Sequence, residues 1–517
     1  MSTTRRVVSG SIASWLRIGI TMLSQLILVP IYLTYWDVQT YAIWITVQAL
    51  LTVISVFNQG HQTYLEFKFL KEGEKNKETI SADLWSGLAA GALIGFSEIG
   101  LVLIFITTGI ASELLGIASV RDQQIVHDGG LLLLIQISIW STFTSLTGLI
   151  ARSLSPFGYY SRMGWWQVWA GLVQTFVPVI AVTLGAGLLT TGMILALATV
   201  IGSIPQLIDI SRLLKRIGIN YSKPSFPRAF KNFTRSIVLS ARSLLENFRQ
   251  QGVRIVLSPL VGAAALVGFS TTRTAANIAL QGLNTITNPL MPELMRFLNN
   301  RDQDKTEASF STVWLIVLAL LTPGFIILQY FIGPLFRIWT KGQVEFQPLL
   351  FAQLSFGVLV FAVAQPAMAV LRGNNLLRPQ LLISLVAAVT AVGGMFILVP
   401  MFGINGAGTA LLLAEIFATA GYRIVARDWL KENGLSWPVR SSRIVLGSVW
   451  LSALVMVALV YIHQYRWVVL LVGLALMFFC VRLYWNSLPR LAVSKVQSMA
   501  SRLSFLKFKT NAATITK

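Results

Sequence analysis

The chain has 517 residues, of which 55% are hydrophobic and only 12% charged, and its formal net charge is +21. A soluble domain carries about 25% charged residues, so this composition, with a mean hydropathy of +0.69, excludes an ordinary soluble protein. A single cysteine, Cys480, excludes a disulfide framework, and the three histidines lack metal-ligand spacing. We therefore expect a polytopic membrane protein with no metal and no cofactor.

Apolar stretches of about 20 residues, long enough to cross a bilayer, recur along the whole chain. They predict an all-α membrane protein with about fourteen transmembrane helices. Arg5 and Arg6 precede the first stretch and no small-residue cleavage site follows it, so we expect an uncleaved span rather than a signal peptide. The predicted spans are 11–33, 41–64, 83–108, 129–151, 165–184, 188–210, 236–258, 264–290, 310–332, 348–371, 379–399, 405–425, 443–462 and 466–485.

An internal repeat with an offset of 229 residues organises these spans. Six polar residues follow one another at helical spacing and form a stripe within an arc of roughly 80°: Ser270, Arg273, Asn277, Gln281, Asn284 and Asn288. Residues 229 positions before the last four form the same stripe on the second span: Gln48, Thr52, Ser55 and Gln59. The span 236–258 is rich in charges, and we predict it because this offset pairs it with the first span.

Two such repeats predict two pseudo-symmetric six-helix bundles, an architecture of secondary transporters. We expect an N-terminal half at 1–210, a basic cytoplasmic connector at 211–235 and a C-terminal half at 236–425. Two extra helices, the thirteenth and fourteenth, would occupy 426–485, and a basic amphipathic cytoplasmic tail would occupy 486–517.

The distribution of basic residues predicts the orientation. With the N-terminus in the cytoplasm, 32 of the 41 lysines and arginines fall in cytoplasmic segments. The outer loops then hold only Arg121, Arg337, Lys341 and Arg466. Both termini are therefore expected in the cytoplasm, and contact with anionic membrane lipid, not nucleic acid, accounts for the charge.

Five arginines fall within predicted spans: Arg17, Arg242, Arg249, Arg254 and Arg273. A charge at this depth costs ~3 kcal/mol on insertion scales and usually faces a cavity or a partner. An excess of arginine favours an anionic passenger, because the guanidinium pairs with phosphate or carboxylate. Structural alternatives remain open: Arg17 at the inner interface, Arg254 at the outer interface, and Arg273 paired with Glu246.

Amides and acids complete the predicted site. The amides are expected either to line a wet cavity and bind sugar hydroxyls or to join helices; they are Gln25, Gln48, Gln59, Asn277, Gln281 and Asn284. Glu98, Glu246 and Glu415 are either sites for a coupling proton or sodium ion or satisfied buried acids.

Three segments resemble one transporter family. Residues 11–59, 371–375 (Leu-Arg-Gly-Asn-Asn) and 402–408 (Phe-Gly-Ile-Asn-Gly-Ala-Gly) are similar to Wzx-like polysaccharide biosynthesis flippases. These belong to the multidrug/oligosaccharidyl-lipid/polysaccharide exporter (MOP) superfamily. The resemblance implies two six-helix bundles facing each other in a V, as in multidrug and toxic compound extrusion (MATE) transporters, in the bacterial cytoplasmic (inner) membrane.

The resemblance also implies a substrate: an undecaprenyl-diphosphate-linked oligosaccharide, such as an O-antigen or exopolysaccharide repeat unit, moved by alternating access. Arg17 and Arg273 match basic positions of the first and eighth helices of the family, and Arg249 or Arg254 those of the seventh. All four are expected to bind the diphosphate. The second span holds His61 but no arginine or lysine, which departs from the lipid II flippase subgroup.

We therefore interpret the chain as a non-enzymatic flippase. One alternative is an ion-coupled multidrug antiporter of the same superfamily, against which the excess of arginine argues. A less favoured alternative is a membrane glycosyltransferase or ligase, which usually needs a large outer loop, whereas the loops near 109–128 and 333–347 are short.

Overall fold

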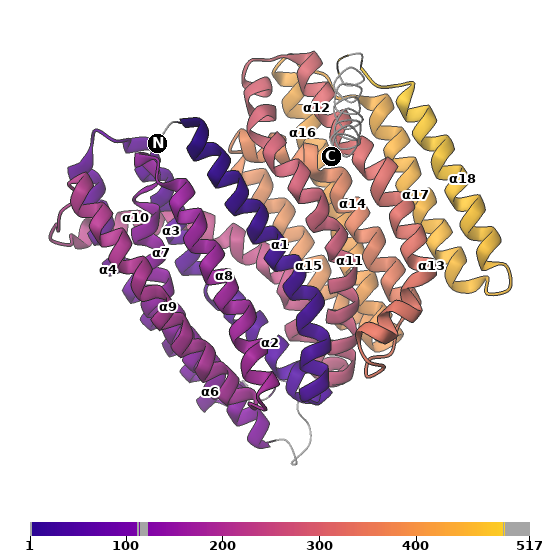
Figure 1. The fold of residues 1–517 in the computed structure, drawn as a ribbon. Coiled ribbons are helices and arrows are strands. Elements are labelled where there is room, and N and C mark those ends of the chain that lie inside the picture. The colour runs from indigo at the N-terminus through magenta and orange to yellow at the C-terminus, as the bar shows by residue number, and fades with distance from the viewer. Residues whose placement is uncertain (1–2, 111–112, 114–122, 490, 492–517) are drawn as a thin grey trace, which may run out of the picture. The chain divides into compact units, whose positions relative to one another are not determined.

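The computed structural model describes residues 3–110, 113, 123–489 and 491, without the side chains of residues 3–8, 123 and 284–292. The described residues form helices and loops, with no strand (Figure 1). The α-helices are α1 (Thr3–Tyr35), α2 (Val38–Ile54), α3 (Val56–Glu72), α4 (Lys77–Thr107), α6 (Gln123–Ile139), α7 (Ser145–Arg152), α8 (Tyr160–Thr183), α9 (Leu188–Ile217), α10 (Phe226–Asn247), α11 (Val253–Asn299), α12 (Gln303–Ile316), α13 (Thr322–Trp339), α14 (Pro348–Gly373), α15 (Leu377–Phe402), α16 (Ile404–Glu432), α17 (Val439–Tyr461) and α18 (Arg466–Trp485). Three π-helical turns, η2 (Trp140–Thr144), η4 (Phe248–Gly252) and η5 (Val317–Leu321), and a 3-10 turn, η3 (Ser155–Phe157), join some of them.

All fourteen predicted spans lie on helices, so the predicted all-helical membrane fold is confirmed. Among the described residues, twelve helices are long and apolar enough to cross a membrane, and the bent pair α2 and α3 raises the number to thirteen. One of the twelve is the 58-residue stretch Phe226–Leu283. At 1.5 Å per residue it would measure roughly 87 Å, far more than the ~30 Å of a bilayer core. Its backbone leaves the helical region at Gly262 (φ 85°, ψ 174°), which separates the predicted seventh and eighth spans.

Contacts divide the chain into two compact units. Unit 1 contains residues 1–274, 336–346 and 384–411, and unit 2 contains residues 275–335, 347–383 and 412–517. Residues 211–217 belong to α9 and residues 226–235 to α10, so only a short part of the predicted connector lies outside helices. The predicted halves at 1–210 and 236–425 remain an inference from the internal repeat, as does the tail, which lies mostly outside the described residues.

Unit 1 is built around a ring of five helices. In sequence around the ring, α1 contacts α8, α8 contacts α9, α9 contacts α6, α6 contacts α2, and α2 contacts α1. Figure 1 shows α8 between α1 and α9. The first ring helix ends where Asp37 caps α2, its carboxylate accepting a hydrogen bond from the Thr40 amide at 2.7 Å. This cap lets α1 and α2 form adjacent walls of one ring.

Unit 2 packs around α14, of whose most apolar 18-residue window 94% is buried. The Trp314 indole N–H on α12 donates to the Val363 carbonyl on α14 at 3.0 Å. Phe310 and Trp437 pack against the Trp314 ring at 5.9 and 5.6 Å between centroids. An apolar helix surrounded by other helices is therefore the core of this unit.

Within unit 1, α10 is held against α3 and α4 by a buried carboxylate. The Asp83 side chain on α4 is fully buried and lies 2.8 Å from the Lys68 ammonium on α3. Two α10 residues also reach it: Asn232 donates at 3.1 Å, and the Arg228 guanidinium lies at 3.5 Å. Asp83 therefore joins three helices through one charge.

We expect Asp83→Asn to destabilise the protein, because Lys68, Arg228 and Asn232 lose the buried carboxylate that joins their helices. Loss of a hydrogen bond to a charged group costs about 2 kcal/mol of the free energy of unfolding. Thermal unfolding of the purified protein in detergent measures this loss. Asp302→Asn is the matched control, because Asp302 caps α12 beside the exposed Lys305 and asparagine caps a helix equally well. Equal melting temperatures for the two variants would contradict the assignment.

Candidate functional site

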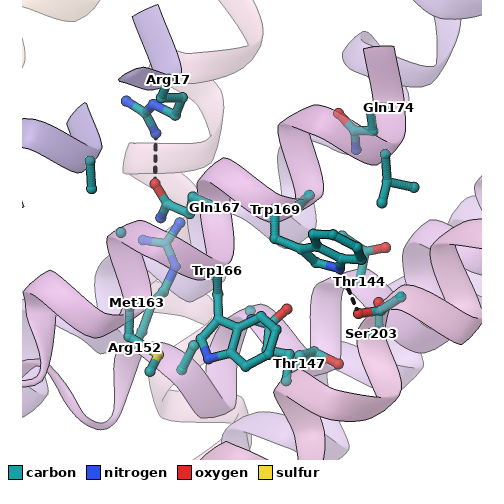
Figure 2. Close-up of a pocket in the computed structure, with 18 of the residues that line it drawn as sticks. Arg17, Thr144, Thr147, Arg152, Met163, Trp166, Gln167, Trp169, Gln174 and Ser203 are labelled. Carbon is teal, nitrogen blue, oxygen red and sulfur yellow. Dashed lines mark hydrogen bonds between the residues drawn. The ribbon is translucent and has the colours of Figure 1, made fainter. Parts of the chain in front are cut away.

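A cavity of about 450 Å³ lies inside unit 1. We call it the α8 cavity, because α8 supplies more of its walls than α1, α3, η2, α7 or α9. Figure 2 shows its side chains, with Arg17 and Arg152 toward one end and Trp169, Gln174 and Ser203 toward the other. Three helices of the ring, α1, α8 and α9, therefore border a space whose lining combines polar and apolar side chains.

Arg17 projects from α1 into this cavity. Its guanidinium donates to the Gln167 side-chain oxygen on α8 at 2.7 Å (Figure 2). Arg17 is exposed, and it forms no ion pair with any residue in the described part of the chain. Within the described residues, the predicted cationic ligand of the first span is therefore paired with a neutral amide that an anion can replace.

A second arginine, Arg152 at the end of α7, lines the same cavity. It forms an ion pair with Glu66 on α3, and Ser155 donates to the same carboxylate at 3.3 Å. Arg17, Arg152 and Glu66 are the charged residues that line the α8 cavity. Two positive groups and one negative group leave this end of the cavity with one net positive charge.

A smaller cavity of about 370 Å³ adjoins the first. We call it the α2 cavity, because the stripe Gln48, Thr52, Ser55 and Gln59 lies along its wall. The Gln48 amide donates to Gln136 on α6 at 2.8 Å, and the Gln59 amide donates to Ser55 at 3.2 Å. The first of the two predicted polar stripes therefore faces a cavity, while its role in binding stays a prediction.

The remaining candidate arginines gather around the π-turn η4 and line neither of these two cavities. Arg249 lies in the turn and pairs with Glu246. Arg273 on α11 donates to both the backbone carbonyl and the side-chain oxygen of Gln250, each at 2.5 Å. Arg254 donates to Gln251 at 3.1 Å. π-turns often occur at functional sites, and here the turn brings two glutamines to two arginines.

The other predicted amides are spread over both units. Gln25 is half-buried on α1 and lines neither cavity. Asn277 and Gln281 are half-buried on the part of α11 that belongs to unit 2. The Asn284 side chain lies outside the described residues. Their predicted contact with sugars is untested.

The three candidate coupling acids are not among the residues that line the two cavities. Glu98 is 4% exposed and accepts a hydrogen bond from Ser141 of η2 at 2.8 Å. Glu415 is 8% exposed on α16, where it packs near Gly357 of α14. Glu246 is the partner of Arg249. Ion coupling through any of them stays a prediction.

Most of the α8 cavity was not predicted from the sequence. Its principal wall carries Tyr160, Gly164, Gln167, Ala170 and Gln174 at successive helical turns. Two glutamines seven residues apart in an otherwise apolar span would have indicated this face. The 229-residue offset predicted the stripe on the second span instead. Arg152 lies at the end of a helix, where a charged residue does not lower the hydropathy of a span and so does not indicate a cavity.

The sequence matches no protein-family model and no curated protein significantly. Solved structures with the same fold are found. The lipid II flippase MurJ, in an inward-closed conformation, superposes with a TM-score of 0.62, covering 93% of this chain and all of that one, at 14% identity. The Vibrio cholerae MATE transporter VcmN gives a TM-score of 0.56 at 14% identity, over 83% of this chain and 98% of that one.

A third structure, a MOP superfamily transporter from Pyrococcus furiosus, gives a TM-score of 0.54 at 15% identity, over 83% of this chain and 96% of that one. Such low identities establish the fold alone. The chain is an all-helical, multi-pass membrane protein whose fold is similar to those of MurJ and VcmN.

We expect Arg273→Ala to destabilise the protein and Arg17→Ala to leave its stability unchanged. Arg273 is 6% exposed, and its removal leaves the Gln250 carbonyl and amide oxygens without this donor, whereas Arg17 is exposed. Loss of a buried, charged hydrogen bond costs about 2 kcal/mol. Thermal unfolding of both variants in detergent measures the difference, and an unstable Arg17→Ala variant would contradict this account.

Proposed function

We propose that this protein is a flippase that moves a polyprenyl-diphosphate-linked oligosaccharide across the membrane by alternating access. The observation that carries the proposal is Arg17: a guanidinium without an ion-pair partner among the described residues, facing a cavity in a MOP transporter fold. A diphosphate is the anion that suits this guanidinium best, because a planar guanidinium forms paired hydrogen bonds with phosphate oxygens.

The charge of the site decides between classes of passenger. A cavity with one net positive charge attracts an anion and repels a cation, and the effect is strong where lipid excludes water. Arg152 strengthens the site if the diphosphate competes with Glu66 for it. Arg249, Arg254 and Arg273 stay candidate ligands in this proposal, since a phosphate would replace the amide and carboxylate oxygens that they now contact.

The proposal includes the biological setting implied by the sequence. The excess of basic residues in alternate loops supports cytoplasmic termini in a bacterial cytoplasmic membrane, in contact with anionic lipid. The resemblance to polysaccharide flippases supports an O-antigen or exopolysaccharide repeat unit as the cargo. We also propose that a proton or sodium ion drives transport by binding at Glu98, Glu246 or Glu415. The proposal includes no catalytic step.

An ion-coupled multidrug antiporter is the second candidate, because MATE transporters share this fold. The tryptophans of the α8 cavity would suit flat aromatic drugs. The net positive charge of the same cavity disfavours the organic cations that such antiporters export.

The test is transport by the full chain in proteoliposomes. The substrate is a fluorescent polyprenyl diphosphate carrying a short oligosaccharide, and its arrival in the opposite leaflet is followed by a membrane-impermeant quencher. We expect Arg17→Ala to reduce the rate roughly tenfold, which corresponds to the loss of ~1.4 kcal/mol of binding. Arg17→Lys should retain part of the rate, because it keeps the charge but loses the paired geometry.

Arg212→Ala is the matched control, because Arg212 is exposed on α9 and lines neither cavity. It should transport at the wild-type rate. Normal transport by Arg17→Ala at equal protein levels would overturn the proposal. Export of ethidium by the wild-type protein, without movement of the labelled lipid, would establish the multidrug alternative.

A further inference from the structure

We propose that the α8 and α2 cavities together bind the sugar residues of the passenger. This inference rests on the proposed function and deepens it. The diphosphate would sit at the Arg17 end, and the sugars would extend from there into the interior of unit 1.

Charge is confined to one end of the joined space. The charged lining residues, Arg17, Arg152 and Glu66, line the α8 cavity alone, and none of the residues lining the α2 cavity is charged. Four residues line both cavities and mark where they adjoin: Trp140, Thr144, Gln174 and Thr199. A ligand that fills both spaces therefore has an anionic end and a neutral, polar remainder.

Aromatic side chains supply flat apolar surfaces along this path. The Trp166 indole N–H donates to Asp209 at 2.9 Å, and that of Trp169 donates to the Gly202 carbonyl at 3.1 Å. These bonds fix the two rings, which lie along the cavity wall in Figure 2. The C–H faces of sugar rings pack on such surfaces, because an aromatic face is both apolar and slightly negative.

Carboxamides supply the complementary polar contacts. Gln174 lines both cavities, is exposed, and forms no hydrogen bond with any other residue that the structure describes. A carboxamide presents an acceptor and two donors side by side, which suits two neighbouring hydroxyls of a sugar. Gln174 is therefore the side chain best placed to bind a sugar at the junction.

Two buried donors in the walls also lack acceptors. Gln136, on the wall of the α2 cavity, is only 7% exposed, and its side-chain nitrogen has no partner among the described residues. The Trp140 indole N–H is likewise buried without a partner in the described structure. A buried unsatisfied donor costs about 1–3 kcal/mol. Sugar hydroxyls, which accept as well as donate, would supply the missing acceptors.

Other ligand classes fit less well. An organic cation would need a carboxylate, and Glu66 is already bound by Arg152 and Ser155. A second anion would find no cation in the lining of the α2 cavity. An acyl chain would leave Gln174, the Gln136 nitrogen and the Trp140 indole N–H without hydrogen-bond partners, at a cost that hydrophobic burial does not offset.

The experiment compares two ligands on one variant. The full chain in nanodiscs is titrated with bare undecaprenyl diphosphate and with the same lipid carrying a neutral trisaccharide of N-acetylhexosamines. We expect Gln174→Leu to weaken binding of the glycosylated lipid roughly tenfold and to leave binding of the bare lipid unchanged. Arg17→Ala should weaken both.

Gln464→Leu is the matched control, because Gln464 lies in an exposed loop and lines neither cavity. It should bind both lipids normally. If Gln174→Leu binds both lipids as the wild type does, the sugar site is refuted, while a loss of both lipids in Arg17→Ala still supports the flippase. If Arg17→Ala binds both normally, the proposed function itself fails.

A second variant tests the direction of the path independently. Thr199→Phe would obstruct the junction, since Thr199 lines both cavities. A single sugar should still bind beside the arginines, whereas the trisaccharide should bind at least tenfold more weakly than to the wild type. Equal losses for both chain lengths would overturn the inferred path into the α2 cavity.

Discussion

The cost of placing an arginine in a membrane span governs the polar architecture of unit 1. A guanidinium stays charged at physiological pH, so each one requires partners within hydrogen-bond reach or a wet space. Arg249 is buried against Glu246, and Arg273 is buried against both oxygens of Gln250. Arg17 has a single neutral amide and an open cavity. The need of each guanidinium for partners is therefore met by packing around η4, for Arg249 and Arg273, and by an open cavity on α1, where Arg17 can still bind an anion.

The helix ring explains why the available charge lies beside aromatic and amide groups. Because α8 packs between α1 and α9, one face of α8 is turned to the interior of the ring and carries Gln167 and Gln174. The π-turn η2 supplies Trp140 and Thr144, which line both cavities. A wider helical turn shifts the side chains that follow it, so this local irregularity lies where the two cavities adjoin.

The sequence allowed the helices and one polar stripe to be predicted, because both depend on periodicity. Gln48, Thr52, Ser55 and Gln59 repeat at the helical period and do line a cavity. Hydrogen bonds between side chains on different helices were not predictable. Nothing in the position of Arg273 indicates that Gln250, on the preceding span, accepts its hydrogen bond. Arg152 pairs with Glu66 from a different helix, and both lie near helix ends where charged residues ordinarily meet water. Hydropathy cannot distinguish such a pair from solvated residues.

The contrast between Arg17 and Arg273 also shows why an excess of arginine is weak evidence when it is taken alone. Both residues lie within predicted spans, yet Arg273 packs around a π-turn and Arg17 faces a cavity. Charge count predicts the sign of the passenger only through the arginines whose partners are neutral and replaceable. In unit 1, Arg17 meets this condition and also faces a cavity, and under the proposed function the neutral polar walls beyond it favour a passenger with one anionic end. A glycan linked to a lipid through a diphosphate has this distribution of charge, whereas a compact inorganic anion or a hydrophobic cation does not.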